Sequence, residues 1–158
     1  RFFTVYGPWG RPDMALFKFT KSILEGKKID IYNKGNLYRD FTYIDDIVKG
    51  VSSLITKIPN YKKNPSLNKI DSLSTVAPFR IINIGNSKKI KLLDFIKAFE
   101  NSLGKKALRN YMPMQKGDVL MTLANTKLLK RITGFKPKTN YKEGVRKFVE
   151  WYLDYYKK

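Results

Sequence analysis

The sequence predicts an α/β fold, because strand-like runs alternate with amphipathic helical segments. The run Phe2–Tyr6 is rich in aromatic and β-branched residues and ends at Gly7-Pro8, which is typical of a strand followed by a turn. The run Arg80–Gly85 has apolar residues on both faces, as a parallel strand requires. Lys91–Leu103 places its apolar residues on one side of a helix. A chain of 158 residues suits a single domain with a substantial core.

The first forty residues are expected to hold a helix between strands. The helix is Met14–Glu25, with Asp13 as its N-cap and Gly26 placed to end it. Pro12 biases Arg11 away from the helix, so Arg11 lies on a loop between a strand's carboxyl end and a helix start, where ligands bind in α/β proteins. Two short strands then flank a turn, and the spacing favours a plain hairpin made of Ile29–Tyr32, the turn 33–36 and Leu37–Thr42.

A second helix is expected to begin with a capping box. Thr42 and Asp45 occupy the two positions of that motif, and apolar residues then keep helical spacing for three turns over 47–58. The paired carboxylates Asp45 and Asp46 suggest either a metal or acid–base site, or two acids that complement the helix dipole by about 0.3–1 kcal/mol each. We favour the second interpretation. Pro59–Thr75 is polar and lacks a period, which predicts a flexible loop.

The C-terminal third is expected to contain a strand and two helices. The strand is Ala107–Met112, and a loop with a turn at Gly117 follows it. A short helix is predicted over 125–134. The last helix begins at the N-cap Asn140, and its apolar stripe is core or interface, formed by Val145, Phe148, Val149, Tyr152 and Tyr156.

Composition excludes several kinds of site and partner. The chain contains neither Cys nor His, which excludes disulfides, thiolate or imidazole metal ligands and imidazole catalysis. It has no long apolar run, so we expect no transmembrane helix, no membrane partner and a cytoplasmic location. The net charge of +19 fits a nucleic-acid partner, an anionic ligand, or a surface simply covered with lysine. Because the lysines are scattered and no nucleic-acid-binding motif occurs, we favour the last interpretation.

Three motifs carry a resemblance to a known family. They are RFFTVYGPWGRPDMALFKF (Arg1–Phe19), RDFTYIDDI (Arg39–Ile47) and MPMQKGDV (Met112–Val119). These stretches resemble the extended short-chain dehydrogenase/reductases, and within them the UDP-glucuronate 4-epimerases, a subgroup of capsular polysaccharide nucleotide-sugar epimerases. The match is to the C-terminal, substrate-binding portion, so the chain 1–158 reads as a single fragment without the N-terminal dinucleotide-binding half. By the resemblance, residues 1–6 and 80–85 are the last parallel strands of the Rossmann sheet.

The resemblance implies a UDP-sugar as ligand. A diphosphate is best matched by the planar fork of an Arg, and the candidate is Arg39, which lies mid-strand where a cation without an anionic partner is costly to bury. Pairing with an Asp is the alternative for Arg39. The family's matching residues imply that Asp118 accepts hydrogen bonds from the ribose hydroxyls. Gln115 stands as a neutral donor where many relatives have Arg.

The sugar and the cofactor are expected to contact the N-terminal motif. By the resemblance, Arg11 pairs with the carboxylate of a uronate, and Thr4 donates a hydrogen bond to the same group. Phe3 is expected to pack near the nicotinamide ring of NAD. Judged without the resemblance, Thr4 and Phe3 are indistinguishable from ordinary strand residues.

By the same resemblance, the complete enzyme takes hydride from C4 of the sugar with bound NAD, lets the ketone rotate and returns hydride to the other face. The general base belongs to a Tyr-x-x-x-Lys pair, and no tyrosine of this chain is followed by Lys at that spacing. We therefore expect no epimerase activity from the chain alone. The alternatives are a non-catalytic module that assembles with a complementing chain or a second copy, a UDP-sugar dehydratase or decarboxylase, and a basic nucleic-acid binder.

Overall fold

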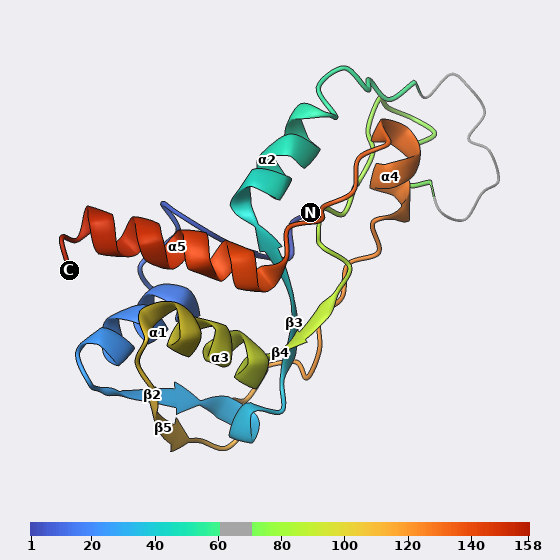
Figure 1. Cartoon of the computed structure of the whole chain (residues 1–158). Coiled ribbons are helices and arrows are strands. Elements are labelled where there is room, and N and C mark those ends of the chain that lie inside the picture. Colours follow the sequence, from blue (N-terminus) through green and yellow to red (C-terminus); the bar gives the residue numbers. More distant parts are fainter. Residues whose placement is uncertain (61–70) are drawn as a thin grey trace.

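The structure is a computed structural model that describes residues 1–60 and 71–158. Its central sheet has the strand order β1-β3-β4 (Figure 1). β1 (Thr4–Tyr6) and β3 (Tyr38–Tyr43) are parallel, and β4 (Lys89–Lys91) is antiparallel to β3. A second, parallel sheet pairs β2 (Lys28–Ile31) with β5 (Leu108–Tyr111). The predicted α/β class is confirmed.

Three helices pack on one another between these sheets: α1 (Ala15–Leu24), α3 (Leu92–Leu103) and α5 (Tyr141–Tyr155) (Figure 1). Their apolar faces form one core with β1 and β3. At its centre the rings of Phe41 and Phe95 stack with 3.7 Å between centroids. The aromatic and aliphatic stripe predicted for the last helix lies in this core, with Val145, Phe148, Val149 and Tyr152 buried, whereas Tyr156 is exposed.

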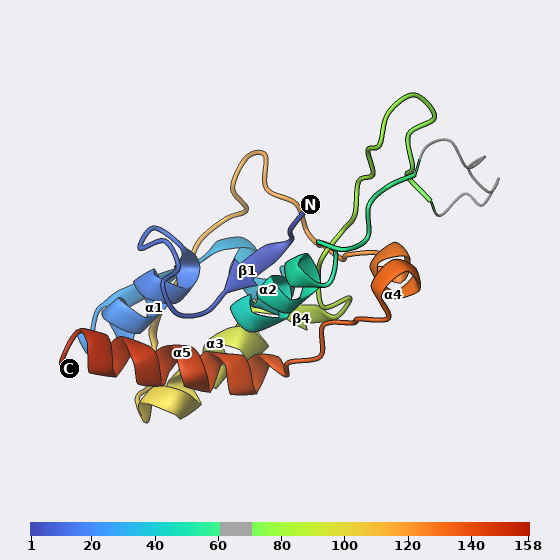
Figure 2. The same ribbon diagram turned by 90° about the horizontal axis from the view of Figure 1, so that it is seen from above.

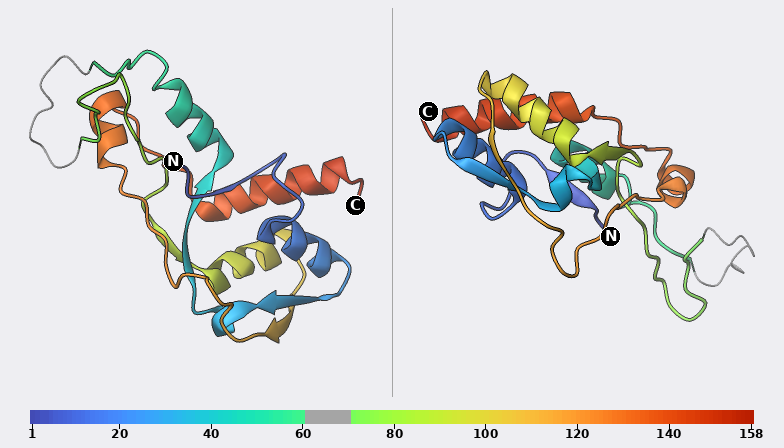
Figure 3. Two further views of the ribbon diagram at one scale, coloured as in Figure 1. Left: turned by 180° about the vertical axis from the view of Figure 1, so that it is seen from behind. Right: turned by 90° about the horizontal axis from the view of Figure 1, so that it is seen from below.

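β3 connects this core to a smaller part of the molecule. One end of β3 follows the 3₁₀ segment η1 (Tyr32–Gly35) near β2, and the other end leads directly into α2 (Ile44–Ser52) (Figure 3). α2 and α4 (Lys127–Thr133) lie away from the β2–β5 pair (Figure 1), and α4 lies at the opposite end of the molecule from the C-terminus (Figure 2). A second apolar cluster joins them through Ile47, Ile84 and Leu129.

A fully buried carboxylate holds β3 to two loops. Asp40 accepts hydrogen bonds from the backbone N–H groups of Asn86 at 2.9 Å, Ser87 at 3.0 Å and Ala124 at 2.8 Å. The hydroxyl of Thr42 donates to it at 3.4 Å. These donors replace the water that the charge loses on burial, so Asp40 fixes the position of both loops against β3.

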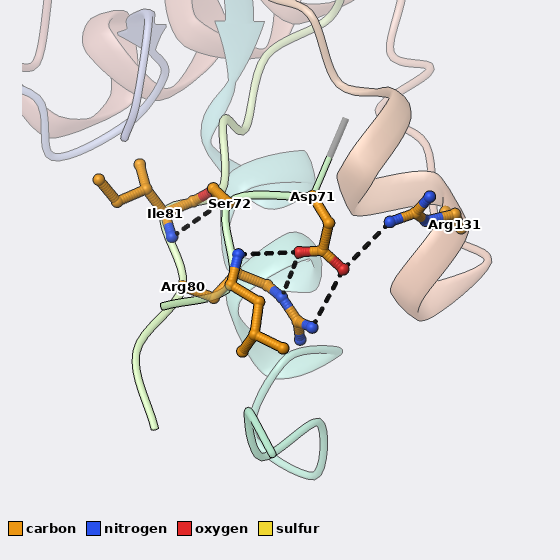
Figure 4. A network of polar contacts seen from close by, with 6 residues as sticks. Asp71, Ser72, Arg80, Ile81 and Arg131 are labelled. Atoms are coloured by element: carbon orange, nitrogen blue, oxygen red, sulfur yellow. Dashed lines mark hydrogen bonds and ion pairs between the residues drawn. The ribbon is translucent and has the colours of Figure 1, made fainter. Parts of the chain in front are cut away.

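A second polar network ties α4 to the segment that precedes β4 (Figure 4). Asp71 accepts from Nε of Arg80 at 2.9 Å and from the guanidinium of Arg131, which lies on α4, at 3.1 Å. Next to it, the backbone N–H of Ile81 donates to the Ser72 hydroxyl at 3.1 Å. The network holds 71–72 and 80–81 side by side.

The predicted hairpin is wrong. β2 pairs with β5, and β3 pairs with β1 and β4, so the two predicted hairpin strands belong to different sheets. Between them Asn33 and Lys34 have φ values of 49° and 51°. Such positive φ values also occur in tight hairpin turns, so the local sequence is compatible with a hairpin. The hairpin does not form because each strand pairs with a different, distant strand.

Two predicted helix caps are also wrong. Asp13 does not cap α1, because its carboxylate binds Arg11 instead. Thr42 does not cap α2, because its hydroxyl donates to Asp40. α2 ends at Ser52, so the helix is shorter than the apolar spacing over 47–58 predicts.

The paired acids at the start of α2 have separate surroundings. Asp45 is exposed, whereas Asp46 is 3% exposed and accepts from the backbone N–H groups of Lys138 at 3.1 Å and Thr139 at 2.8 Å. Asp46 therefore joins α2 to the segment before α5. Within 1–60 and 71–158, no three His, Cys, Asp or Glu side chains are grouped as a metal site would need.

The remaining predictions are mostly confirmed. α3, β5, α4 and α5 form at the expected places, and Asn140 accepts from the N–H of Lys142 as the N-cap of α5. The predicted strand over 80–85 is wrong, because this run forms no continuous strand and meets the first strand only in a single parallel bridge between Phe2 and Ile84. Most of the predicted loop Pro59–Thr75 lies outside the described residues. In the described parts, no helix has the length and apolarity to cross a membrane.

Candidate functional site

A cavity of about 390 Å³ lies between β1, α1, the end of β2 and the start of β3. Its walls are largely apolar and carry a small number of charged and hydroxyl groups, which is typical of a small-molecule site. Two of the residues that the sequence predicts, Thr4 and Arg39, are in its lining, which consists of Thr4, Asp13, Ala15, Lys18, Phe19, Asp30, Tyr32, Leu37, Arg39, Phe41 and Leu92.

Arg39 and Asp118 form an ion pair at this cavity. The guanidinium of Arg39 lies 2.6 Å from Oδ1 of Asp118, and these side chains are 17% and 30% exposed. Arg39 also donates to the backbone carbonyl of Tyr38 at 2.9 Å. Pairing of Arg39 with an Asp, which the sequence left open, is what the structure shows, and the Asp is the residue predicted to bind ribose.

The loop after β5 brings Asp118 to β3. The N–H of Tyr38 donates to the carbonyl of Leu120 at 2.9 Å, and the N–H of Thr122 donates back to Tyr38 at 3.2 Å. Gly117, with φ of 82°, allows the turn in which the N–H of Asp118 reaches the carbonyl of Gln115 at 3.2 Å. The turn therefore presents the Asp118 carboxylate to Arg39.

Arg11 lies outside the cavity lining, beside one of its members. Its side chain is 75% exposed and makes two hydrogen bonds to Asp13, from Nε at 3.0 Å and from Nη2 at 2.5 Å. This bidentate contact holds the pKa of the Asp13 carboxyl below its ordinary value. Because Asp13 lines the cavity, Arg11 is attached to its rim.

The other predicted residues are placed differently. Thr4, on β1, is half-buried in the cavity wall. Phe3 is half-buried next to it but is not in the lining. The Gln115 side chain is exposed on the loop, and its backbone carbonyl closes the Asp118 turn. The structure thus places Thr4 and Arg39 in the lining, joins Asp118 to Arg39 from outside the lining, and leaves the side chains of Phe3 and Gln115 apart from the cavity.

Sequence reasoning missed three polar residues of the lining: Lys18, Asp30 and Tyr32. Asp30 accepts from the Asn110 side chain at 2.7 Å. Lys18 adds a cation to the wall, and its charge helps to lower the pKa of Asp13, another residue of the lining. For Lys18, the helical spacing of the sequence could have given the signal, because Ala15, Lys18 and Phe19 fall on the same face of α1.

Comparisons with known proteins find similar sequences and similar folds. The family model described as NAD dependent epimerase/dehydratase matches residues 1–68. Protein CapI of Staphylococcus aureus is 55% identical over 158 residues, which is 100% of this chain and 47% of CapI. A probable UDP-glucuronate 4-epimerase of Rhizobium meliloti is 48% identical over 159 residues, again 100% of this chain and 47% of the relative. The chain spans about half the length of the curated relatives it matches.

Solved structures share the fold along nearly the whole chain. UDP-glucuronic acid 4-epimerase from Bacillus cereus, in complex with UDP-glucuronic acid and NAD, superposes with a TM-score of 0.80 at 29% identity, over 99% of this chain and 45% of that chain. MoeE5 in complex with UDP-glucuronic acid and NAD gives a TM-score of 0.78 at 26% identity, over 98% and 46%. By sequence and by fold, the chain is therefore similar to about half of these relatives and solved structures, and the predicted resemblance to extended short-chain dehydrogenase/reductases is confirmed.

Proposed function

We propose that the chain is the UDP-sugar-binding part of an NAD-dependent UDP-glucuronate 4-epimerase. The observation that carries this proposal is the Arg39–Asp118 pair at a cavity of about 390 Å³. A guanidinium offers parallel donors to a diphosphate, and a carboxylate accepts from ribose hydroxyls. One pair therefore contains both groups that a nucleoside diphosphate needs. The relatives named as UDP-glucuronate 4-epimerases support the choice of ligand.

Binding would exchange one set of contacts for another. The diphosphate takes the place of Asp118 on the guanidinium of Arg39, and the freed carboxylate turns to the ribose. Lys18 adds a positive charge in the same wall. Arg11 faces solvent at the rim, where it can release Asp13 and take up the carboxylate of a uronate, with the Thr4 hydroxyl as a second donor.

NAD would be held mainly by residues that this chain does not contain. The sequence has no glycine-rich dinucleotide loop. Phe3, half-buried directly before the strand that begins at Thr4, suits packing against a nicotinamide ring. When bound, NAD supplies the hydride acceptor and donor for C4 of the sugar. The residues of this chain bind and orient the sugar nucleotide, and without a Tyr-x-x-x-Lys pair we expect no turnover from the chain alone.

We further propose that a polypeptide covers an apolar face formed by α2, its continuation and Phe2, which precedes β1. Val48, Val51 and Ile55 follow helical spacing on α2 and its continuation, and they are 54%, 43% and 74% exposed. Phe2, bridged to the segment beside α2, is 58% exposed. Adjoining exposed apolar side chains mark interaction surfaces. The relatives are about twice as long as the chain. We therefore propose that the face is covered by a complementing polypeptide that corresponds to the other half of such a relative. When that polypeptide is absent, a second copy of this chain takes its place.

Calorimetry with the chain tests the proposed ligand. UDP and UDP-glucuronate are titrated to about 1 mM, with uridine as the uncharged comparison and ATP as a polyanion that reports on the charge of +19. We expect UDP to bind at least about tenfold more tightly than uridine or ATP, because both Arg39 and Asp118 are engaged. Equal affinities for UDP and ATP contradict the proposal. So does the absence of binding by a chain that circular dichroism shows to be folded.

A further inference from the structure

Trp9 has an unusual backbone conformation in the loop that carries Arg11. Its φ is 61°, in the left-handed region, and its side chain is 74% exposed. That region is unfavourable for a residue with a Cβ and is rare for bulky side chains. Such a conformation persists only where its surroundings hold it, so the contacts of Trp9 need an explanation.

The contacts come from the last turns of α5. The ring of Trp9 lies 5.2 Å from that of Trp151 and 5.1 Å from that of Tyr155, measured between centroids. Trp151 and Tyr155 stack on each other at 5.3 Å with 19° between their planes, and we call this pair the aromatic shelf. Aromatic ring contacts are stabilising, so two of them offset the strain at Trp9.

The loop is fixed on both sides of Trp9 as well. On one side, Gly7 has φ of 144° and packs so closely on Ile44 that a Cβ at Gly7 would lie 2.5 Å from that side chain. On the other side, the carbonyl of Arg11 accepts from the N–H of Met14 at 3.1 Å. Between these points Trp9 supplies the contact to α5, so the path of the backbone up to Arg11 depends on the aromatic shelf.

We propose that Trp9 is a positioning residue for Arg11, and that the aromatic shelf of α5 thereby takes part in the choice of a uronate. The inference rests on the proposed function, in which Arg11 binds the sugar carboxylate. Arg11 is exposed, and its recorded side-chain partner, Asp13, belongs to the same loop. The place of the guanidinium is therefore set by the backbone of the loop. When Trp9 leaves the shelf, Arg11 spreads over many positions and the carboxylate loses its partner.

Ligand preference tests the proposal. Trp9→Ala, Trp9→Phe and Tyr155→Ala are compared with Tyr156→Ala, whose ring contacts Tyr152 and Tyr155. For Trp9→Ala and Tyr155→Ala, we expect the affinity ratio of UDP-glucuronate over UDP-glucose to fall about fivefold or more, with the affinity for UDP within about twofold. Trp9→Phe retains part of the ratio, and Tyr156→Ala retains all of it. An unchanged ratio, or an equal loss for both sugars, overturns the proposal.

Hydrogen exchange of the free chain tests the positioning without any ligand. In Tyr155→Ala we expect faster deuterium uptake in peptides spanning residues 7–13, and unchanged uptake in peptides from α3. Unchanged uptake over 7–13 overturns the proposal. If the unsubstituted chain binds no UDP-sugar, the proposed function fails, whereas the exchange result still decides whether the shelf holds the loop.

Discussion

Arg39 and Asp118 are 79 residues apart in the sequence and 2.6 Å apart in the structure. The contact satisfies both charges in a wall where neither side chain is more than a third exposed. A ligand that binds there must replace Asp118 on Arg39, so its affinity is the difference between the new and the old contact. The ion pair therefore keeps Arg39 oriented towards the cavity and also competes with an incoming diphosphate.

The first prediction concerns this pair. We expect Arg39→Met to weaken the binding of UDP about tenfold or more, because a charge-assisted hydrogen bond to the diphosphate is lost. Calorimetry measures the change. Arg146→Met is the matched control, since Arg146 is an exposed residue of α5 that pairs with Glu143 and Glu150. Equal losses in the two variants would show that total charge, and not Arg39, attracts the ligand.

Asp118→Asn separates the two roles of the carboxylate. If Asp118 accepts from ribose, we expect UDP to bind several-fold more weakly in the variant, although Arg39 has lost its competitor. Tighter binding of UDP by Asp118→Asn would show that Asp118 acts only as the competitor. Inorganic pyrophosphate, which lacks ribose, is the control ligand, and we expect it to bind more tightly to this variant than to the unsubstituted chain.

Arg11 is predicted to distinguish acidic from neutral sugars. We expect Arg11→Ala to weaken UDP-glucuronate about fivefold or more and to leave UDP-glucose nearly unchanged, because only the uronate carries a carboxylate at C5. Calorimetry with both ligands gives the ratio. Lys27→Ala is a suitable control, because Lys27 is likewise exposed and ion-paired, in its case to Glu25. An equal loss of affinity for UDP-glucuronate and UDP-glucose would show that Arg11 does not bind the sugar carboxylate.

Asp40 is predicted to be essential for stability. Asp40→Ala leaves the backbone N–H groups of Ser87 and Ala124 without their acceptor, and removes one of the two acceptors of the Asn86 N–H, which also donates to the Thr42 hydroxyl at 3.0 Å. At about 1–3 kcal/mol for each unsatisfied buried group, we expect the free energy of unfolding to fall by about 3 kcal/mol or more. Urea denaturation measures it. Asp45→Asn, at an exposed acid, should change the value by less than about 0.5 kcal/mol.

Glu100 gives a prediction about pH. Its carboxyl is 4% exposed. Burial opposes ionisation, but the N–H of Ala107 at 3.1 Å and the guanidinium of Arg109 at 2.9 Å outweigh it and lower the pKa below its usual value of 4.5. A pKa lowered by folding adds stability above the unfolded-state pKa, and this stability is lost as the pH falls below that value.

We therefore expect Glu100→Gln to lower the urea midpoint at pH 7 and to differ less from the unsubstituted chain as the pH falls from about 5 to 3. Glu150→Gln, at an exposed position of α5, is the control for a general effect of charge. A difference between Glu100→Gln and the unsubstituted chain that stays constant down to pH 3 would mean that Glu100 is not ionised more readily in the folded state.

The apolar face formed by α2, its continuation and Phe2 predicts that copies of the chain associate. Light scattering should give a mass above that of a single 18.4 kDa chain as concentration rises, and Val48→Ser combined with Ile55→Ser should reduce it. Leu108→Ser, at an exposed apolar residue of β5, is the control. A mass of one chain at every concentration would contradict the proposed interface.

The sequence by itself determined the helices and caps that depend on neighbouring residues. Lys91–Leu103 has helical spacing and is followed by Gly104, whose φ of 63° ends α3 as a glycine C-cap does. Asn140 caps α5 because its side chain needs only the N–H two residues on. The sequence also pointed to Arg39 and Asp118, but as two separate ligands of a nucleotide.

Only the tertiary structure decided which segments meet. It paired β2 with β5 in place of the predicted hairpin, turned Asp13 from a helix cap into the partner of Arg11, and joined Arg39 to Asp118. It also seated Trp9 on the aromatic shelf of α5. Periodicity and capping depend on neighbours within about one turn, whereas these contacts depend on how distant segments pack, which no short window of sequence contains.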